Sequence, residues 1–255
     1  MIRTGSRLRG PQLYTQSDFA ALSGAAFRAR GVLDDLISRA RSGVYALELE
    51  ALCLERIEAA GAKSAMADID GFGFACSISV DDVVTHGRPD NEPLRRGQVV
   101  TIDLMLSLDG WHADVAETIV VGGGGHPLLD ALDAVWDAGL AEIRPGAAWT
   151  EVTRAMVEAA RANGIRLVRG LAGHGIGFAP HELPVLPLVP EPGDPPVVLR
   201  PGMVFTLEPA VTTGDGNTID SEDGWAIRTA DGAPSAAREA MIAVENDGIR
   251  VFGGA

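Results

Sequence analysis

The chain of 255 residues has few cysteines, few aromatic side chains and a deficit of basic charge. Cysteine occurs only at Cys53 and Cys76, so the sequence suggests neither a disulfide framework nor a thiolate metal cluster. The 21 Lys and Arg residues against 35 Asp and Glu give a formal net charge of −14, which repels nucleic acid backbones and anionic membrane surfaces. No run of about 18 apolar residues occurs. We therefore expect neither nucleic acid nor a membrane as a partner.

The beginning of the chain is basic but does not continue as a secretory signal. Arg3, Arg7 and Arg9 resemble the start of such a signal, yet Gly10-Pro11-Gln12 stands where the apolar stretch should follow. We expect a cytoplasmic protein. Its hydrophobic content of 46% is enough for a sizeable core in one large or two small domains.

What the chain does contain is a pattern that occurs twice. The pattern of residues 94–103 (LRRGQVVTID) is repeated in residues 199–208 (LRPGMVFTLE), 105 positions later (208 − 103). In each copy an apolar stretch ends in a residue with a carboxylate side chain. A second pattern repeats at nearly the same offset: Arg41-Ser-Gly43 with Glu48 and Gly61, then Arg144-Pro-Gly146 with Glu151 and Gly164. Two copies are too few for a solenoid. The repeat predicts a pseudo-symmetric domain whose halves bring Asp103 and Glu208 to a shared centre.

The periodicity of apolar residues predicts the same order of elements in each half, about 18–121 and 126–255, after a short N-terminal segment 1–17. Helices are predicted over 19–41, 47–60, 128–143 and 149–163, and strands over 75–84, 99–108, 111–121, 203–208, 225–229 and 239–245. Glycines 122–125 are expected to link the halves, the Pro-rich residues 184–201 to form a surface loop and residues 214–216 a turn.

The dipeptide Asp109-Gly110 is a strong signal for a two-residue hairpin turn. That turn places Asp103 opposite Ala116 and Asp114 opposite Met105, so both carboxylates lie on one face of the sheet. The strand around Asp103 is apolar on both sides, and a buried lone carboxylate costs several kcal/mol unless it is paired or bound to a metal. Taken singly, Asp114 could be a solvated hairpin residue. Together the two like charges favour a divalent cation site.

Histidines add nitrogen donors to this set of carboxylates. His174 lies in Gly173-His-Gly-Ile-Gly177, where glycines let the backbone approach a ligand, and His181 precedes Glu182 shortly afterwards. His86 also stands beside a glycine. One histidine alone is more often a core residue, but Asp, Glu and His together are typical ligands of Mn, Co, Fe or Zn.

Five motifs resemble, in order and spacing, the metal-ligand motifs of type I methionine aminopeptidases, two-metal peptidases of the pita-bread fold. They are Thr101-Ile-Asp103, Asp109-Gly-Trp-His-Ala-Asp114, Gly173-His-Gly-Ile-Gly177, Thr206-Leu-Glu208-Pro209 and Ser235-Ala-Ala-Arg-Glu239. The resemblance implies one α+β catalytic domain, residues 18–255, with two pseudo-symmetric αα-β halves around a central antiparallel sheet.

The resemblance also implies the chemistry. Two divalent ions (Co, Mn, Fe or Zn) would be held by Asp103, Asp114, His174, Glu208 and Glu239, with Asp114 and Glu239 bridging. Glu208 would accept and return a proton, His181 would contact the oxyanion, and His86 would position the substrate.

The residues around the implied substrate pocket depart from the family. Counting back from His86 assigns Met66, Ile69, Phe72 and Ser77 to pocket positions that the family partly fills with tyrosine and cysteine. Trp225 matches the family's pocket tryptophan. Pro180 stands where an aromatic residue usually precedes His181, and Ala240 replaces a histidine. A hydrophobic pocket tolerates such reshaping at a cost of only a few kcal/mol in discrimination.

We therefore expect a monomeric, metal-dependent aminopeptidase that acts on the N-terminus of peptides or nascent proteins and releases methionine. One alternative is a paralogue with altered first-residue specificity that acts on a dedicated peptide. Another is a non-catalytic binding protein of the same fold, whose signature would be lost ligands, and none is lost. A third is a proline dipeptidase or creatinase-like hydrolase, which usually carries an additional N-terminal domain.

Overall fold

The computed structural model describes residues 10–69, 71–194 and 196–253, so the arginines at positions 3, 7 and 9 lie outside the described residues. The described helices are α1 (Gln16–Arg39), α2 (Ala46–Ala59), α3 (Pro127–Glu142) and α4 (Trp149–Ala162). Each matches a predicted helix to within three residues at either end. In the described part of the chain, none of these helices combines the length and apolarity needed to cross a bilayer.

Local signals explain where these helices begin and end. Thr15 and Asp18 form a reciprocal capping box at the start of α1, with the Thr15 amide donating to Asp18 Oδ2 at 2.7 Å. Glu48 accepts from the Tyr45 amide at 2.8 Å at the start of α2. Gly61 follows α2 with a φ of +71°, a backbone conformation that favours glycine and ends the helix.

The strands are short except for one long hairpin. They are β1 (Lys63–Ser64), β2 (Cys76–Val80), β3 (Val83–Thr85), β4 (Val99–Leu108), β5 (Trp111–Val120), β6 (Arg166–Leu167), β7 (Ala172–Gly175), β8 (Glu182–Pro187), β9 (Val204–Leu207), β10 (Ala210–Thr212), β11 (Thr218–Asp220), β12 (Ile227–Thr229), β13 (Ser235–Ala237), β14 (Ala240–Val244) and β15 (Ile249–Phe252).

Within the described ranges, the strand pairs are antiparallel and form two main sheets and two small ones. In the first half, β4 pairs with β1, β2 and β5, and in the second half the order is β15-β14-β9-β7-β8. The small sheets have the orders β13-β10-β6 and β11-β12-β3. A pair of backbone hydrogen bonds between Ala116 and Glu239, 2.9 and 3.3 Å long, joins the two main sheets at the centre of the molecule.

The two halves repeat the same backbone hydrogen bonds. Gly43 N donates to Leu94 O at 2.8 Å in the first half, and Gly146 N donates to Leu199 O at the same distance in the second. Similarly, Gly97 and Gly202 each donate across 2.9 Å to a valine carbonyl, those of Val121 and Val244. The repeated sequence patterns therefore occupy equivalent positions in the fold.

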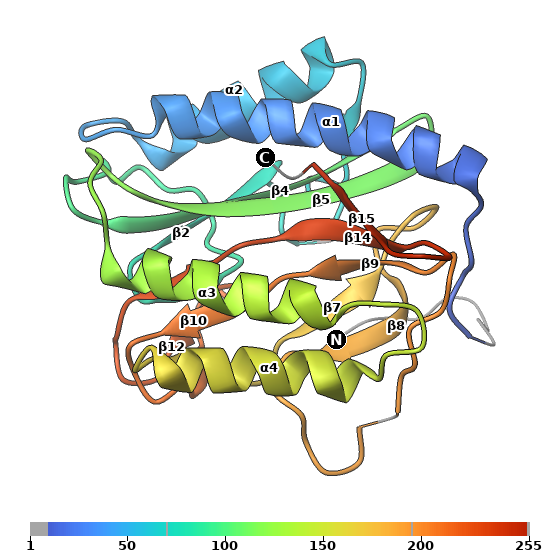
Figure 1. The fold of residues 1–255 in the computed structure, drawn as a ribbon. Helices are drawn as coiled ribbons and strands as arrows, with labels where there is room; N and C mark the ends of the chain where they lie inside the picture. Colours follow the sequence, from blue (N-terminus) through green and yellow to red (C-terminus); the bar gives the residue numbers. More distant parts are fainter. Residues whose placement is uncertain (1–9, 70, 195, 254–255) are drawn as a thin grey trace.

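Each half buries its own hydrophobic core. The first core lies between helices α1 and α2 and strands β4 and β5, and the second between helices α3 and α4 and strands β9 and β14. In Figure 1 the first helix pair is at the top, the second is at the bottom, and these strands run between them. Because the helices cover the outer face of the strands, the polar residues of the strands face inward at the junction of the halves.

Two predicted segments require correction. The prediction of a surface loop over 184–201 is wrong at its start, because β8 pairs along β7 with Val185 opposite His174. Prolines are tolerated there because β8 is an edge strand. The single strand predicted over 75–84 is divided into β2 and β3 by a turn at Asp81, whose φ is +54°.

The buried carboxylate of Glu50 in α2 holds the beginning of β2. It accepts hydrogen bonds from the amides of Ala75 at 2.7 Å and Cys76 at 3.1 Å. Glu50→Ala should lower the free energy of unfolding by about 2–3 kcal/mol, because two buried amides lose their acceptor. Glu50→Gln keeps one acceptor oxygen and should lose less. Urea unfolding of both variants tests this, and equal stability of wild type and Glu50→Ala would contradict it.

Candidate metal centre

The predicted ligands and histidines converge on one pocket of about 340 Å³. It lies where the two main sheets meet and opens to solvent. The predicted residues that line it are Met66, Ile69, Phe72, His86, Asp103, Asp114, His174, His181, Glu208, Trp225 and Glu239. One pocket therefore contains the carboxylates, the imidazoles and the apolar side chains that the sequence separates by up to 173 positions (239 − 66).

The hairpin of β4 and β5 has the register predicted from its turn. Asp103 lies opposite Ala116 and Asp114 lies opposite Met105. The two carboxylates thus face the pocket from neighbouring strands, one diagonal apart. Asp114 is only 6% exposed.

His174 presents one defined ring nitrogen to the carboxylates. Its Nδ1 lies 3.1 Å from the Gly175 carbonyl oxygen, a contact that requires the proton on Nδ1. The lone pair of Nε2 is then directed at the pocket, 3.8 Å from Asp114 Oδ2 and 3.8 Å from Glu208 Oε1. Burial lowers the pKa of His174 to about 3, which keeps the ring neutral and able to bind a cation.

Thr206 connects His174 to Glu208. Its hydroxyl accepts from the His174 amide at 3.0 Å and donates to Glu208 Oε1 at 2.6 Å. The strands around it approach so closely that a Cβ on Gly173 would collide with the Thr206 carbonyl, and one on Gly175 with the Leu183 carbonyl. The glycines on either side of His174 are therefore required by strand packing.

Glu239 enters the pocket from the seam between the sheets. Its backbone is paired with Ala116, and the Thr118 hydroxyl holds the preceding strand by donating to the Ala237 carbonyl at 2.6 Å. Among the described residues, Glu239 Oε1 is one of three buried side-chain polar atoms without a hydrogen-bond partner. One ligand atom each from Asp114, His174 and Glu239 lies within 4.8 Å of the others. An unpartnered carboxylate oxygen at that position fits a metal ligand.

The electrostatics of the pocket disfavour four negative charges together. Burial raises the pKa of Asp103 to about 7 and that of Glu208 to about 8. For Asp114, burial raises the pKa well above its ordinary value, and the charges of Asp103 and Glu208 raise it further. The pKa of Glu239 rises for the same reasons, with burial as the largest cause. A bound cation would remove this conflict and favour the ionised forms.

His86 and His181 lie at the exposed rim of the pocket. The His181 ring is 4.3 Å from the His174 ring between centroids. His86 adopts a φ of +55°, a conformation that non-glycine residues rarely take and that often marks functional positions. A Cβ on the following residue, Gly87, would collide with the Ile78 carbonyl. The chain therefore turns sharply after β3 and directs His86 to the rim.

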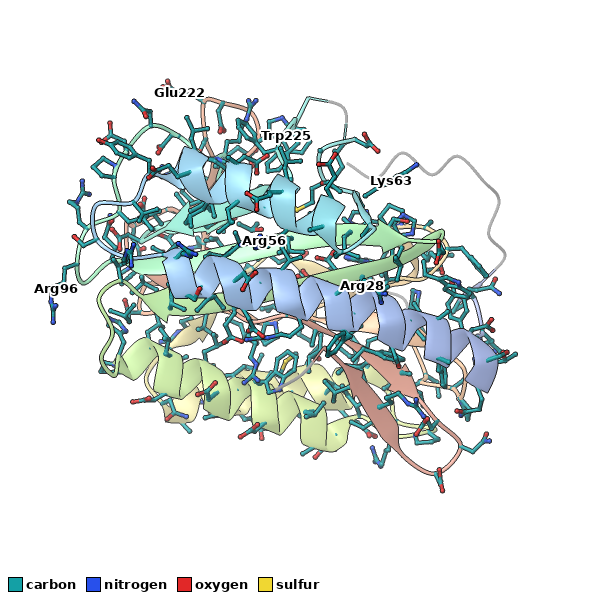
Figure 2. The ribbon with its side chains drawn as sticks, turned by 90° about the horizontal axis from the view of Figure 1, so that it is seen from above. Arg28, Arg56, Lys63, Arg96, Glu222 and Trp225 are labelled. Carbon is teal, nitrogen blue, oxygen red and sulfur yellow. The ribbon has the colours of Figure 1, made fainter. Side chains whose placement is uncertain are left out.

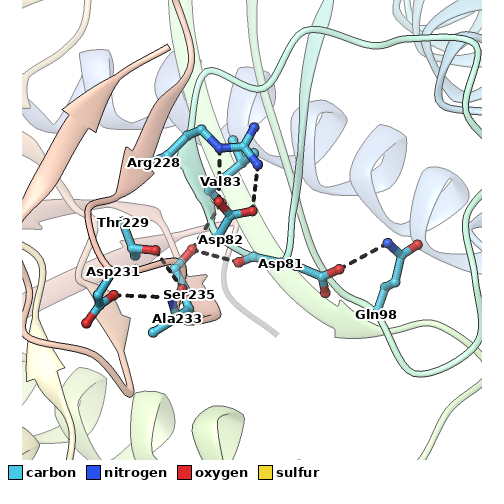
Figure 3. Close-up of polar contacts among 9 residues, drawn as sticks. All are labelled: Asp81, Asp82, Val83, Gln98, Arg228, Thr229, Asp231, Ala233 and Ser235. Atoms are coloured by element: carbon cyan, nitrogen blue, oxygen red, sulfur yellow. Dashed lines mark hydrogen bonds and ion pairs between the residues drawn. The ribbon is translucent and has the colours of Figure 1, made fainter.

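Polar contacts hold β3 against the second half of the chain (Figure 3). Arg228 in β12 forms two hydrogen bonds with Asp82, at 2.7 and 2.9 Å. The Ser235 hydroxyl at the start of β13 donates to the Val83 carbonyl at 3.0 Å and lies 3.2 Å from the Asp81 carbonyl. These contacts hold β3, and with it His86 at the pocket rim, against the strand that precedes Glu239 inside the pocket.

The predicted residues Met66, Ile69, Phe72 and Trp225 contribute to the apolar part of the pocket. Met66 and Phe72 are buried, and the Phe72 and Trp225 rings are 5.2 Å apart between centroids. Figure 2 shows Trp225 beyond α2, close to the edge of the molecule where Glu222 lies. The aromatic wall thus combines a loop of the first half with a loop of the second.

Two of the predicted substrate residues do not line the pocket. Ser77 is completely buried in β2, and its hydroxyl lies 3.3 Å from that of Ser79, which does line the pocket. Pro180 lies in the bend before His181 and also stays outside the lining residues. The same count from His86 placed Met66, Ile69 and Phe72 correctly, so it fails only at Ser77, which is buried within β2.

Two further residues of the site were not predicted: Thr206, which lies behind the pocket and hydrogen-bonds to Glu208, and Val185, which lines the pocket. Thr206 stands two positions before Glu208, as Thr101 stands two before Asp103, so the repeated pattern contained a signal for it. Val185 lines the pocket because it pairs with His174 across β7 and β8. No local signal identifies Val185, since its position depends on the pairing of two strands that were not predicted.

Comparison with known proteins agrees with this geometry. The chain matches metallopeptidase family M24 over residues 20–246. It belongs to this family. It is 34% identical to a methionine aminopeptidase of Treponema pallidum (strain Nichols) over 224 residues, covering 87% of this chain and 88% of the relative. The crystal structure of the methionine aminopeptidase from Rickettsia prowazekii has a TM-score of 0.91 at 31% identity, covering 96% of this chain and 100% of that one.

A more distant structure shares only the fold with this M24 metallopeptidase. A prolidase from Pyrococcus furiosus has a TM-score of 0.74 at 18% identity, with 96% of this chain but 66% of the prolidase covered. The predicted α+β pita-bread fold and the predicted metal-dependent hydrolase are thus confirmed.

In the metal-free state, the stability of this metallopeptidase should depend on pH through Asp103. The ordinary pKa of this carboxyl is 3.8, and burial raises it to about 7 in the folded protein. Between these values the folded state holds a proton that the unfolded state has lost, so the contribution of Asp103 to stability falls as pH rises. His174, whose pKa is lowered, has the opposite pH dependence, so a variant is needed to separate the two residues.

We expect the Tm of wild type minus the Tm of Asp103→Asn, both measured with EDTA, to fall as the pH rises from about 4.5 to about 7.5. Added Mn(II) should reverse the difference at the higher pH, because the ionised carboxylate then has a cation partner. Asp247→Asn, at an exposed position, is the control. A difference that stays constant with pH would show that Asp103 does not carry a raised pKa.

Proposed function

We propose that this M24 metallopeptidase is an aminopeptidase that releases methionine, or another small or unbranched apolar residue, from the N-terminus of peptides and nascent proteins. One observation carries the proposal: Asp103, Asp114, His174, Glu208 and Glu239 share a pocket with a wall of apolar side chains. The relatives from Treponema and Rickettsia, both named methionine aminopeptidases, support the same assignment.

The donor set fits divalent cations. Carboxylate oxygens and a neutral imidazole nitrogen suit Mn, Co, Fe or Zn, and Glu239 Oε1 has no hydrogen-bond partner without one. We infer two ions, with Asp114 and Glu239 shared between them. When bound, the ions would supply an activated water and polarise the scissile carbonyl.

The protein side chains have distinct roles in this proposal. Glu208, oriented by Thr206, takes the proton of the attacking water and returns it to the leaving amine. His181 donates a hydrogen bond to the developing oxyanion from the pocket rim. His86 contacts the substrate on the other side of the rim, and Met66, Phe72 and Trp225 enclose the first side chain.

The wall residues favour a paralogue with altered specificity as the second candidate. Met66 lines the pocket, whereas Pro180 contributes no wall to it. A methionine side chain at residue 66 occupies volume that a smaller residue would leave to the substrate. The structure therefore supports a reshaped first-residue pocket beside a complete set of predicted ligands.

Glu208→Gln should reduce kcat by about 10²- to 10⁴-fold, because the amide preserves the size of the side chain but cannot accept the proton. His181→Ala should also lower kcat, since one oxyanion contact is lost. Steady-state kinetics at measured metal occupancy test both variants, with the exposed Glu222→Gln as control. Wild-type turnover by Glu208→Gln at full occupancy would refute the proton-transfer role.

The enzyme should cleave only peptides that have a free α-amino group. We expect a peptide library, digested with Mn(II), Co(II) or Fe(II), to lose only small or unbranched apolar first residues, and acetylated peptides to remain intact. Met66→Ala should raise kcat/KM for methionine relative to alanine as the first residue, on the order of tenfold, because the pocket gains volume. Cleavage of acetylated peptides at the same rate would exclude an aminopeptidase.

A further inference from the structure

Tyr14 lies outside the predicted catalytic domain in sequence but inside it in structure. It precedes α1, is only 5% exposed, and its amide donates to the Gly202 carbonyl at 2.7 Å. Its ring packs against Trp111 and Phe178, with centroid distances of 5.7 and 5.6 Å. The segment before α1 is thus anchored beneath the loop that joins β7 to β8.

The Tyr14 hydroxyl is a centre of hydrogen bonding for that loop. It donates to the Glu182 carboxylate, 2.8 and 2.9 Å from its two oxygens, and accepts from the Phe178 amide at 3.1 Å. Glu182 Oε1 also accepts from the Ala179 amide at 2.8 Å. One phenol therefore fixes both ends of the turn over 178–182, and His181 lies within this turn.

The loop is shaped to fit this phenol. A Cβ on Gly177 would collide with the Tyr14 hydroxyl, so only glycine allows the backbone to pass so close. From the other side, the His112 amide donates to the Gly177 carbonyl at 2.8 Å. The loop backbone is thus held between the tip of the β4–β5 hairpin and Tyr14.

We propose that Tyr14 is a positioning residue that sets the orientation of His181, an inference that rests on the proposed role of His181. Glu182 directly follows His181, so loss of the phenol hydroxyl releases the peptide that carries the imidazole. Oxyanion stabilisation depends on donor placement, and a displacement on the order of 1 Å can cost about 10²-fold in rate. Tyr14 does not line the pocket, so first-residue binding should be preserved.

Tyr14→Phe keeps the packed ring and removes only the hydroxyl. Kinetically, we expect kcat to fall on the order of tenfold or more with KM within about twofold of wild type. Tyr45→Phe is a matched control because Tyr45, the only other tyrosine in the chain, is 39% exposed and remote from this loop. A kcat equal to wild type in Tyr14→Phe would overturn the proposal.

A double-mutant cycle separates positioning from a general structural role. In a His181→Ala background, Tyr14→Phe should cause no further loss of kcat, because the residue through which it acts is gone. An equal loss in both backgrounds would show that Tyr14 acts elsewhere, and the proposal would be wrong.

Hydrogen exchange provides a test that does not depend on activity. In wild type the amides of Phe178 and Ala179 are hydrogen-bonded to the Tyr14 and Glu182 side chains. Tyr14→Phe should accelerate exchange in the peptide over 176–182 and leave the α3 and α4 peptides unchanged. Unchanged exchange in that peptide would refute the anchoring role. An inactive wild type with faster exchange in the variant would instead show that the proposed function has failed while the anchor is real.

Discussion

Four carboxylates, from Asp103, Asp114, Glu208 and Glu239, line one pocket in which burial raises the pKa of each. Much of the surrounding structure serves to hold them there. Like charges in a place of low solvent access cost free energy unless a cation compensates them. The imidazole of His174, a predicted ligand, is kept neutral by burial and adds no positive charge. The pocket therefore favours a positively charged partner, and none of the described residues that line it is a lysine or an arginine.

The pseudo-symmetric halves explain how so many acids reach one place. The long hairpin of the first half contributes Asp103 and Asp114, and the second half contributes Glu208 and Glu239. The backbone pair between Ala116 and Glu239 joins the halves beside these carboxylates. Each half also has its own hydrophobic core. The packing of these two cores, rather than of the loops, offsets the free-energy cost of bringing the carboxylates together.

The region around the substrate is built differently from the set of predicted ligands. The predicted ligands lie on strands or next to their ends, whereas Met66, Phe72 and Trp225 come from loops and His181 from a turn. Loops tolerate substitution more readily than paired strands. The wall positions can therefore change more readily than the positions of the predicted ligands. Side chains outside the pocket also fix these segments: Glu50 accepts a hydrogen bond from the Ala75 amide, where the loop that carries Phe72 leads into β2.

The sequence by itself determined those features that depend on local interactions. The periodicity of apolar residues predicted the described helices, and the Asp109-Gly110 turn predicted the register that places Asp103 and Asp114 on one face. The repeated motifs also indicated that the halves would meet. Only the tertiary structure decided the pairing of β7 with β8, the exclusion of Ser77 and Pro180 from the pocket, and the position of Tyr14 beneath a loop 168 residues away. These features depend on contacts between distant segments, and such contacts leave no periodicity or spacing in the sequence.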